Sequence, residues 1–163
     1  MITQKELKEI FSYNPDTGLL IRNKTTSPAH KKGDVAGGVT SFGYVRVQIK
    51  NKKYMAHRLA WLYMTGEWPR DEIDHIDHIK TNNKWDNLRN VTHRENMLNQ
   101  SIGKNNKSGV TGVSWNKYER LWIAQICINR KDKILARTND LFECCCVRKS
   151  HENKFGFHKN HGQ

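Results

Sequence analysis

The sequence predicts an α+β protein assembled from small sheets and short helices. Strand-like alternation of aliphatic and polar residues is clearest at 44–50, YVRVQIK. Two capping boxes, Thr3 to Glu6 and Thr92 to Glu95, indicate the starts of short helices. Three further strand-like stretches between 110 and 137 precede one helical stretch. With 163 residues and a hydrophobic fraction of 36%, the chain has room for one ordinary domain or two small ones.

The first third of the chain predicts a helix, a hairpin and an amphipathic strand. Apolar residues at helical spacing follow Thr3, so we expect a helix over 3–12. PDTG at 15–18 predicts a turn, and LLIR after it predicts the second strand of a hairpin. Residues 23–43 are polar and glycine-rich and indicate only loops and short strands. The strand over 44–50 would bury one face and present a basic one, and a helix over 54–64 would end at Gly66 and Pro69.

The stretch 71–100 combines acids, histidines and asparagines in one short segment. It predicts a strand (EIDHID), a polar loop (KTNNKWDN), a second strand (LRNV) and a capped helix through about Gln100. Asp71, Glu72, Asp74 and Asp77 lie within seven positions of a basic chain. Carboxylates this close repel one another unless a cation lies among them, and oxygen ligands suit a hard metal such as magnesium. The composition therefore predicts a metal site.

The charge balance indicates a polyanionic partner. Lys and Arg outnumber Asp and Glu by 28 to 16, a formal net charge of +12. Such a chain could bind DNA, RNA or acidic lipid. No run reaches the roughly 18 apolar residues of a membrane span, and the N-terminus lacks the apolar core of a signal peptide, so we expect a cytoplasmic protein. Cys127 and the run 144–146 have neither disulfide-framework nor zinc-site spacing, which predicts reduced, small packing residues.

The motifs in 71–100 resemble those of the HNH nuclease superfamily, in particular the homing endonucleases of phages and introns. The resemblance rests on DH at 74–75, NN at 82–83, NLR at 87–89 and Asn96, in the order strand, loop, strand, helix. It extends upstream through YNPDTGLL, GYVRVQI and AHRLAW, and so covers about residues 10–100. It implies a ββα-metal fold, in which two antiparallel strands and a helix hold one divalent ion, and double-stranded DNA as the partner.

The resemblance assigns catalytic roles to four residues. Asp74 and Asn96 would bind the metal, His75 would take the proton from the attacking water, and Asn87 would tie the loop between the strands and so orient His75. Two oxygen ligands leave most of an octahedral shell to water and phosphate, which favours Mg²⁺, with Mn²⁺ possible. Neighbours in a strand point to opposite faces, so we expect a bend or a strand end at residues 74–75.

Two other histidines have open interpretations. His57 resembles the histidine of the family's HRL helix, and it could pack under the site, contact phosphate or be structural. His78 stands where relatives usually have Gly, so we expect an unusual backbone angle there. Asn90 replaces the Trp common after NLR. Taken singly, the proposed site residues would more often be ordinary surface or core residues; their shared register with the family favours a site.

The last third resembles the plant ethylene-response-factor type of DNA-binding domain. VTGVSW, LWIAQICI and KILAR would be three strands, and Asn139 or Asp140 would cap a helix over 141–155. The resemblance implies that small residues pack between helix and sheet, with the cysteines of 144–146 among them. Ala124 and Ile126 would face the helix. The residues expected to point toward DNA are Thr111, Val113, Gln125 and Cys127.

Base-specific readout by this sheet is doubtful, because several positions usually filled by Arg are not basic here. Trp115 and Trp122 could contact sugar or pack in the core. The stretch 101–109, SIGKNNKSG, predicts a linker able to follow a DNA groove. The residues expected to contact DNA are Lys104, Lys107, Lys117, Arg120, Gln125, Arg130, Lys131 and Lys133.

Together these inferences predict four segments and one function. The segments are an N-terminal extension (1–53), a nuclease core (54–100), a linker (101–109) and a DNA-binding domain (110–163). The function is site-specific hydrolysis of DNA with one metal ion, leaving a 5′-phosphate and a 3′-hydroxyl, by a homing nuclease of the host cytoplasm if phage-encoded. We expect a monomer or weak dimer without an obligate protein partner. The alternatives are an inactive DNA-binding regulator and an RNA-directed protein, for which no exposed aromatic array is evident.

Overall fold

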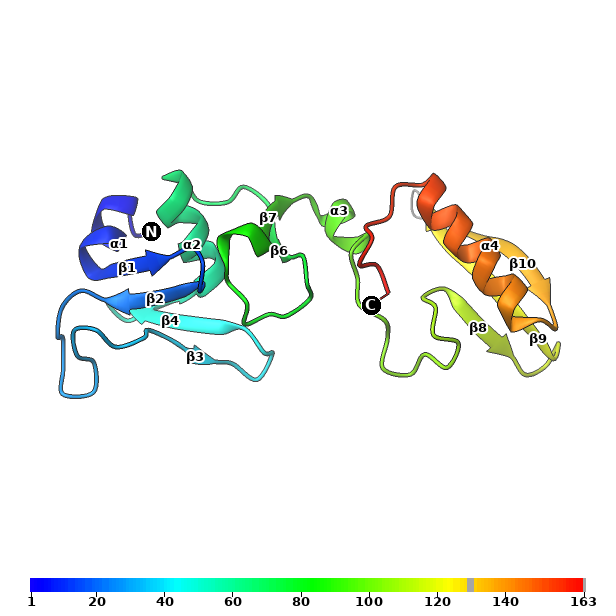
Figure 1. The fold of residues 1–163 in the computed structure, drawn as a ribbon, viewed down its shortest axis with the longest axis horizontal. Helices are drawn as coiled ribbons and strands as arrows, with labels where there is room; N and C mark the ends of the chain where they lie inside the picture. The colour runs from blue at the N-terminus through cyan, green and yellow to red at the C-terminus, as the bar shows by residue number, and fades with distance from the viewer. Residues whose placement is uncertain (129–130, 163) are drawn as a thin grey trace. The chain divides into compact units, whose positions relative to one another are not determined.

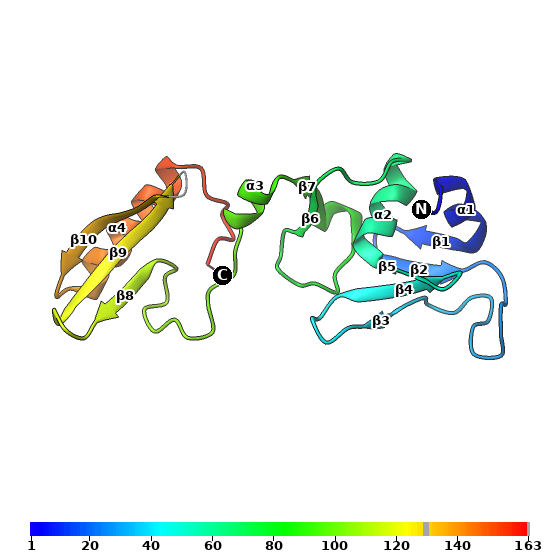
Figure 2. The same ribbon diagram turned by 180° about the vertical axis from the view of Figure 1, so that it is seen from behind.

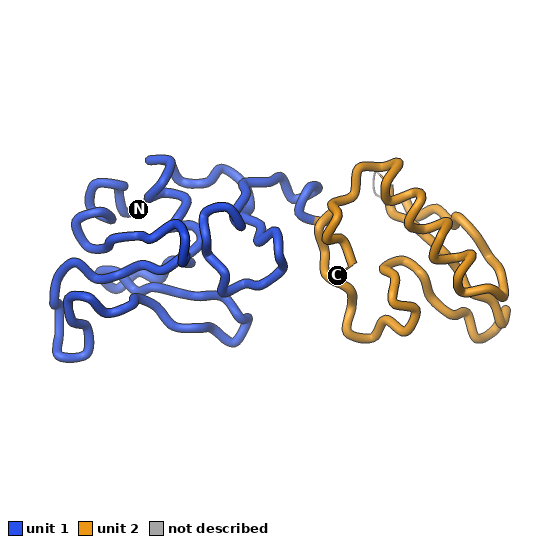
Figure 3. Tube along the Cα trace, viewed as in Figure 1, with its two compact units in different colours: residues 1–96 blue, residues 97–163 orange. Residues whose placement is uncertain are grey.

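The computed structural model describes residues 1–128 and 131–162 and divides them into two compact units. Unit 1 is Met1–Asn96 and unit 2 is Met97–Gln163. Figure 3 colours the two units, and both contain short helices and small antiparallel sheets (Figure 1), so the expected α+β class is confirmed. None of the helices in the described residues is long and apolar enough to span a bilayer. Each unit is considered by itself.

Unit 1 begins with a capped helix and a hairpin. Helix α1 (Gln4–Ile10) starts at Thr3 with the predicted capping box. Strand β1 (Phe11–Asn14) pairs antiparallel with β2 (Leu19–Arg22), as predicted. Gly18 in the turn has φ +73°, and a Cβ there would lie 2.4 Å from the carbonyl carbon of Asn83. Only glycine permits this approach, so the turn lies directly against the loop that follows β6.

A three-stranded sheet and one helix complete the core of unit 1. The sheet order is β3 (Gly38–Val39), β4 (Val45–Ile49), β5 (Lys52–Met55), so part of the unassigned stretch 23–43 forms an edge strand. Helix α2 (Ala56–Thr65) starts two residues later than predicted, because Tyr54 and Met55 pair with β4 instead. The side chains buried most completely here are Leu7, Phe11, Val47, Leu59 and Leu62.

The predicted strand, loop, strand and helix follow at the end of unit 1. They are β6 (Glu72–His75), the 3₁₀ turn η1 (Trp85–Asn87), β7 (Leu88–Val91) and α3 (His93–Met97). Thr92 and Glu95 form the expected capping box. The helix ends at Met97, not near Gln100, and the carbonyls of Leu98 and Gln100 accept N–H bonds from His158 and Gly162. Non-local pairing within unit 2 therefore replaces the last helical turn.

Unit 2 is a three-stranded antiparallel sheet with one helix across it (Figures 1 and 2). The strands are β8 (Val113–Asn116), β9 (Leu121–Ile128) and β10 (Lys131–Thr138), in the order β10-β9-β8. Helix α4 (Leu141–Lys154) is N-capped by Asp140, as predicted, and packs on β9 and β10. The helix side of the sheet includes Ala124 and Ile126, which are both buried as expected.

Several side chains of unit 2 lie elsewhere than expected. Val113 pairs with Ala124 across the strands and is 3% exposed, so it belongs to the core and does not face DNA. The hydroxyl of Thr111 is likewise buried. Of the four free cysteines, Cys144 is buried and Cys145 half-buried, whereas Cys127 and Cys146 are exposed and are not packing residues.

Candidate active site

The strand pair β6–β7 places Asp74 and His75 at the end of a strand. The register pairs Asp74 with Arg89 and His75 with Leu88, and β6 ends at His75 as predicted. Both side chains are buried, at 8% and 4% exposure. Because the strand ends there, two neighbouring side chains that would diverge in a long strand can serve one site.

Asp74 forms an ion pair that the sequence analysis missed. The Nη2 and Nε atoms of Arg89 lie 2.7 and 2.9 Å from Asp74 Oδ2. Cross-strand partners share a sheet face, so the register between EIDH and LRNV could have indicated this pair. A guanidinium at this distance stabilises the ionised form of the buried carboxylate.

His75 is held by an amide and by two rings. Its Nε2 lies 3.1 Å from Asn83 Oδ1, and Asn83 is itself 3% exposed and donates through Nδ2 to the Thr81 carbonyl. If the His75–Asn83 bond is N–H to oxygen, Nδ1 is the basic nitrogen of the ring. The rings of His57 and Tyr44 lie 5.1 and 5.9 Å from that of His75. Asn83 and Tyr44 were not among the predicted site residues.

His57 packs against His75 from helix α2. The two rings meet edge to face, and His57 is 8% exposed with Nδ1 buried and lacking a hydrogen-bond partner among the described residues. Burial first, and then the proximity of His75 and Arg58, lower the pKa of His57 to about 3. A ring that stays neutral at physiological pH fits the interpretation in which His57 packs under the site.

Tyr44 brings the β3–β4 turn to the same place. Burial first, and then the negative charges of Asp74 and Glu72, raise the pKa of the Tyr44 hydroxyl. The Lys80 ammonium lies 4.8 Å from the centre of the Tyr44 ring and donates to the Phe42 carbonyl. The side chains of Tyr44 and Lys80 therefore join the β3–β4 turn and the loop after β6 to the His75 ring.

Asn87 ties the loop between β6 and β7. Its Nδ2 donates to Asp77 Oδ1 at 2.9 Å and to the Asn82 carbonyl at 2.8 Å, and its Oδ1 accepts the Asp77 N–H at 3.0 Å. The loop tie expected of Asn87 is present, and its influence on His75 stays a prediction.

Asp77, to which the resemblance assigned no catalytic role, is a centre of the same loop. Burial raises the pKa of its carboxyl, but hydrogen bonds from Asn82, the Ile79 backbone and Asn87 more than offset this and lower the pKa. The next residue, His78, has φ 63°, so the unusual backbone angle is confirmed. A left-handed residue here closes the loop that Asp77 and Asn87 hold.

Asn96 lies on the Asp74 side of strand β6. Its Nδ2 donates to Glu72 Oε2, and Glu72 also contacts His93 Nδ1 at 2.9 Å. The bond from Asn96, followed by that from His93, lowers the pKa of Glu72. Residues two apart in a strand share a face, so Glu72 links Asn96 to the face that carries Asp74. Glu72 is thus a further residue of the site that the sequence analysis left out.

The donor set offers oxygen atoms from one carboxylate and one amide. Among the residues that the structure describes, no group of three or more His, Cys, Asp and Glu side chains is arranged to hold a metal ion. A site dominated by imidazole or thiolate, of the kind zinc prefers, is therefore not indicated within the described ranges. Asp74 and Asn96 suit a hard ion that keeps several water ligands.

The residues expected to contact DNA are on the surface of unit 2. All of them that fall within the described ranges are exposed, and Arg130 lies outside the described residues. Gln125 lies on the sheet face opposite the helix, paired with Ile134. Lys131 and Lys133 pair with Ile128 and Ile126, which places them on the helix side of the sheet. Trp115 and Trp122 pair on that side too, with ring centres 5.3 Å apart, although Trp115 is 48% exposed.

Comparison with known proteins identifies relatives of this region. Residues 54–98 match the HNH endonuclease family. The chain is 35% identical to Protein 3.8 of Escherichia phage T7 over 88 residues, 53% of this chain and 72% of that one. It is 42% identical over 69 residues to the Uncharacterized HNH endonuclease L560 of Acanthamoeba polyphaga mimivirus, 41% of this chain and 36% of that one.

Two further matches carry homing endonuclease names. YosQ, named as an HNH homing endonuclease of the SPbeta prophage of Bacillus subtilis, is 32% identical over 96 residues, 58% of this chain and 55% of that one. A structure of the HNH homing endonuclease I-HmuI, on its DNA binding and cleavage, matches with a TM-score of 0.45 and 25% identity over 61% of this chain and 56% of that one. The chain thus spans most of Protein 3.8 but only about half or less of L560 and YosQ.

Proposed function

We propose that this chain, which belongs to the HNH endonuclease family, is a site-specific DNA endonuclease that uses one divalent metal ion. The observation that carries the proposal is the buried pair at the end of β6. Asp74 pairs with Arg89, and His75 is held by Asn83 with its ring against His57. This arrangement offers an anionic ligand next to an oriented base.

The chain's own residues would perform three tasks. His75 takes a proton from the attacking water, and the Asn83 contact holds the ring so that its other nitrogen can do so. Asp74 and Asn96 would hold Mg²⁺, or Mn²⁺ in its place, and a bound ion supplies charge stabilisation to the phosphate and the leaving oxygen. Arg89 donates to Asp74 Oδ2 and so holds this carboxylate on its face of β6. Asn87 holds the loop around which these groups are arranged.

The products follow from which bond breaks. Attack of water on phosphorus, in line with the leaving 3′-oxygen, breaks the P–O3′ bond. The phosphate stays on the 5′ end of one product, and the 3′-oxygen of the other product takes up a proton and becomes a hydroxyl. Neutral His57 adds no positive charge beside His75. Tyr44, whose hydroxyl stays protonated, can donate a hydrogen bond but is not a base.

Double-stranded DNA is the substrate we propose, with a homing or other mobile-element role in the host cytoplasm. The net charge of +12 supports a polyanionic partner, and relatives named as HNH homing endonucleases support the class. Unit 2, with exposed lysines and the exposed Gln125, would hold the chain on DNA in the manner of an ethylene-response-factor-like sheet domain.

One observation favours a second function, that of an inactive DNA-binding regulator. The Asp74 carboxylate already accepts two bonds from Arg89 on Oδ2. If Arg89 neutralises Asp74 and takes the place of a metal ion, the chain would bind DNA without cutting it. Metal-dependent cleavage by the wild-type chain separates the two functions, because the regulator would bind DNA and leave it uncut.

The deciding experiment incubates purified protein with supercoiled plasmid and with genomic DNA, with Mg²⁺, with Mn²⁺ or with chelator. We expect metal-dependent nicked or linear products with 5′-phosphate ends, and a rate about 10²- to 10⁴-fold lower for His75→Ala. The control is Asn90→Ala, an exposed residue of strand β7 that has no role in the proposed chemistry. DNA that shifts in a gel but stays uncut with both metals contradicts the enzyme. Equal rates for His75→Ala and wild type contradict the assigned base.

A further inference from the structure

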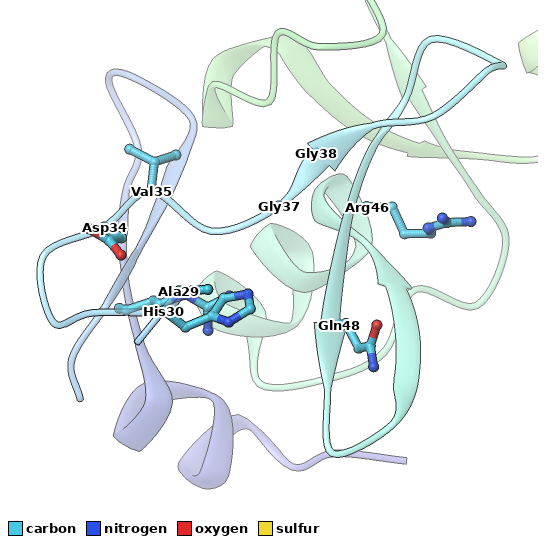
Figure 4. Close-up of a pocket in the computed structure, with 9 residues that line it drawn as sticks. Ala29, His30, Asp34, Val35, Gly37, Gly38, Arg46 and Gln48 are labelled. Atoms are coloured by element: carbon cyan, nitrogen blue, oxygen red, sulfur yellow. The ribbon is translucent and has the colours of Figure 1, made fainter. Parts of the chain in front are cut away.

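We propose that a pocket over Arg22 in unit 1 binds a phosphate group of the DNA backbone. The pocket has a volume of about 420 Å³ and is lined by residues between Arg22 and Gln48 (Figure 4). None of the residues assigned to catalysis lines it. The proposal rests on the proposed function only in taking DNA as the source of the phosphate; the chemistry of the pocket stands on its own residues.

The loop between β2 and β3 folds back on β2 to form the pocket. The backbone N–H of Arg22 donates to the Asp34 carbonyl, and the N–H of Gly33 donates to the Arg22 carbonyl, each at 2.9 Å. Gly37 then passes close to β4 with φ +105°, where a Cβ would lie 2.9 Å from Val45 Cγ1. A side chain at Gly37 would push the loop away from the sheet. The loop forms one wall of the pocket and strand β4 the other.

Arg22 is the buried charge of this pocket. It is 9% exposed, whereas every other lining residue is exposed, so it lies at the base. Its Nε is fully buried and has no hydrogen-bond partner among the described residues, and no ion pair in those residues uses its guanidinium. The guanidinium lies 5.5 Å from the centre of the Phe11 ring. A buried cation without an acceptor is costly, and an anion with several oxygens is the partner that removes that cost.

One acidic residue, Asp34, also lines the pocket, and its negative charge opposes the binding of an anion. Asp34 Oδ2 accepts the backbone N–H of Lys31 at 2.7 Å, so this carboxylate stabilises its own loop. Arg46 on the opposite wall leaves the lining with one net positive charge, counting His30 as neutral. The His30 ring extends from its loop toward β4 in Figure 4, and its Nδ1 is 3.0 Å from Ser27 Oγ. Its other nitrogen is the natural donor to a phosphate oxygen.

The residues around the pocket favour the phosphates of a DNA backbone over a free phosphate ion. Arg46 and Gln48 are on the exposed face of β4, and Lys53 is paired with Gln48 across the sheet. In Figure 4 the Arg46 side chain points away from His30, out from the strand. A single phosphate over Arg22 would leave Arg46 unused, whereas successive phosphates of one DNA strand can occupy both positions. The sheet face thus continues the pocket as a basic track.

The test is a pair of binding measurements in chelator, which need no cleavage. Wild type, Arg22→Met and Gly38→Val are melted with increasing inorganic phosphate, and their affinity for a duplex DNA is measured against salt. Methionine retains packing on Phe11 without the charge. Gly38 has ordinary backbone angles and open space where a Cβ would be, so valine fills the pocket without strain. Lys5→Met removes the same charge from an exposed position on α1.

We expect phosphate to raise the melting temperature of wild type and Lys5→Met more than that of the two pocket variants, beyond the general stabilisation by this salt that all four share. Arg22→Met without phosphate should be at least as stable as wild type, since an unpaired buried charge has gone. DNA affinity should fall about tenfold in both pocket variants. The slope of log affinity against log salt should fall by about one in Arg22→Met.

Two results would overturn the proposal. If Arg22→Met melts lower than wild type and leaves DNA affinity and salt slope unchanged, Arg22 is structural. If phosphate stabilises wild type but the pocket variants bind DNA as wild type does, the pocket takes a free phosphate compound and not DNA. If the melting and DNA-binding results are as expected but the wild type never cuts DNA, the proposed enzyme is refuted and the phosphate site stands. A failure of the proposed function and a failure of this site are therefore distinguishable.

Discussion

The two sheet-and-helix assemblies of the chain are stabilised in opposite ways. In unit 1, β6, β7 and α3 are short, and α3 has five residues of which none is buried. Beside the apolar Ile73, Leu88 and Val91, the buried side chains there include several polar ones, which hydrogen bonds across the strands and within the loop satisfy. In unit 2, α4 has 14 residues, and the core beneath it contains Val113, Ala124 and Cys144.

The two kinds of contact differ in how precisely they position atoms and in how much stability they contribute. A network of polar contacts defines where each atom lies but contributes only about 0.5–1.5 kcal/mol net per hydrogen bond, whereas apolar packing contributes stability with little directional control. The first arrangement suits chemistry and the second suits a scaffold. The predictions below test whether the two assemblies divide these tasks.

The largest expected effect concerns the buried ion pair of unit 2. Arg148 and Glu152 are 3% and 4% exposed and lie 3.4 Å apart, with Lys149 at 2.9 Å from the same carboxylate. Glu152→Ala leaves Arg148 buried without its partner, at a cost of about 3–5 kcal/mol to the unfolding free energy of unit 2. Glu119→Ala, which breaks an exposed pair with Arg137, should cost less than about 1 kcal/mol. Denaturant unfolding measures both; similar losses would remove the distinction between buried and exposed pairs.

The second effect concerns the loop tie of unit 1. Asn87→Ala removes three hydrogen bonds around Asp77 and Asn82, and cleavage should fall about 10- to 100-fold. The control is Asn90→Ala, an exposed residue of strand β7, which follows Asn87 directly; this variant should cut as wild type does. Plasmid cleavage rates at saturating metal give the comparison. Full activity in Asn87→Ala would mean that the tie does not orient His75.

The third effect concerns acid stability. The pKa of His57 is about 3 in the folded protein, below the value near 6.5 of an unfolded chain, so only the unfolded state gains a proton as pH falls from 6.5. The stability contribution is complete above pH 6.5 and is lost toward pH 3, about 2 kcal/mol of it by pH 5. His57→Phe should remove this loss from unit 1.

Unit 2 provides the contrast for that measurement. Burial lowers the pKa of His161 as well, so acid should also destabilise unit 2, and His57→Phe should not change that. Denaturant unfolding at pH 8 and pH 5 separates the two contributions. An unchanged pH dependence of unit 1 in His57→Phe would show that another group is responsible.

The smallest effect concerns the two helix caps. Thr92→Ala removes the capping box of α3 and Asp140→Ala removes the N-cap of α4, each at about 1 kcal/mol. Only Thr92→Ala should also slow cleavage, since α3 carries Asn96. Melting curves and cleavage rates of both variants provide the test. Equal slowing of cleavage by Asp140→Ala would contradict the division of tasks between the units.

Local patterns were sufficient to predict most elements. Both capping boxes, the hairpin at β1–β2, the amphipathic strand β4 and the three strands before α4 are where periodicity and turn residues indicated. The candidate ligands and base were also found from sequence, because the family motif places them at fixed spacing. Their roles stay predictions.

The surroundings of those residues were not accessible to the same reasoning. The Arg89–Asp74 pair depends on strand register, and the contacts of Tyr44 and His57 with His75 join residues far apart in the chain. Val113 was assigned to the wrong face because the register of β8 against β9, and not the resemblance, decides which side a residue faces.

The sequence by itself determined the α+β class, the capped helices and the candidate groups proposed to act on a phosphodiester, because capping, alternation and motif spacing are local. Only the tertiary structure decided which of these groups are buried, paired and neutral. Those properties depend on desolvation and on charges contributed by distant segments, as at His57, or on a loop that folds back to bury a cation, as at Arg22.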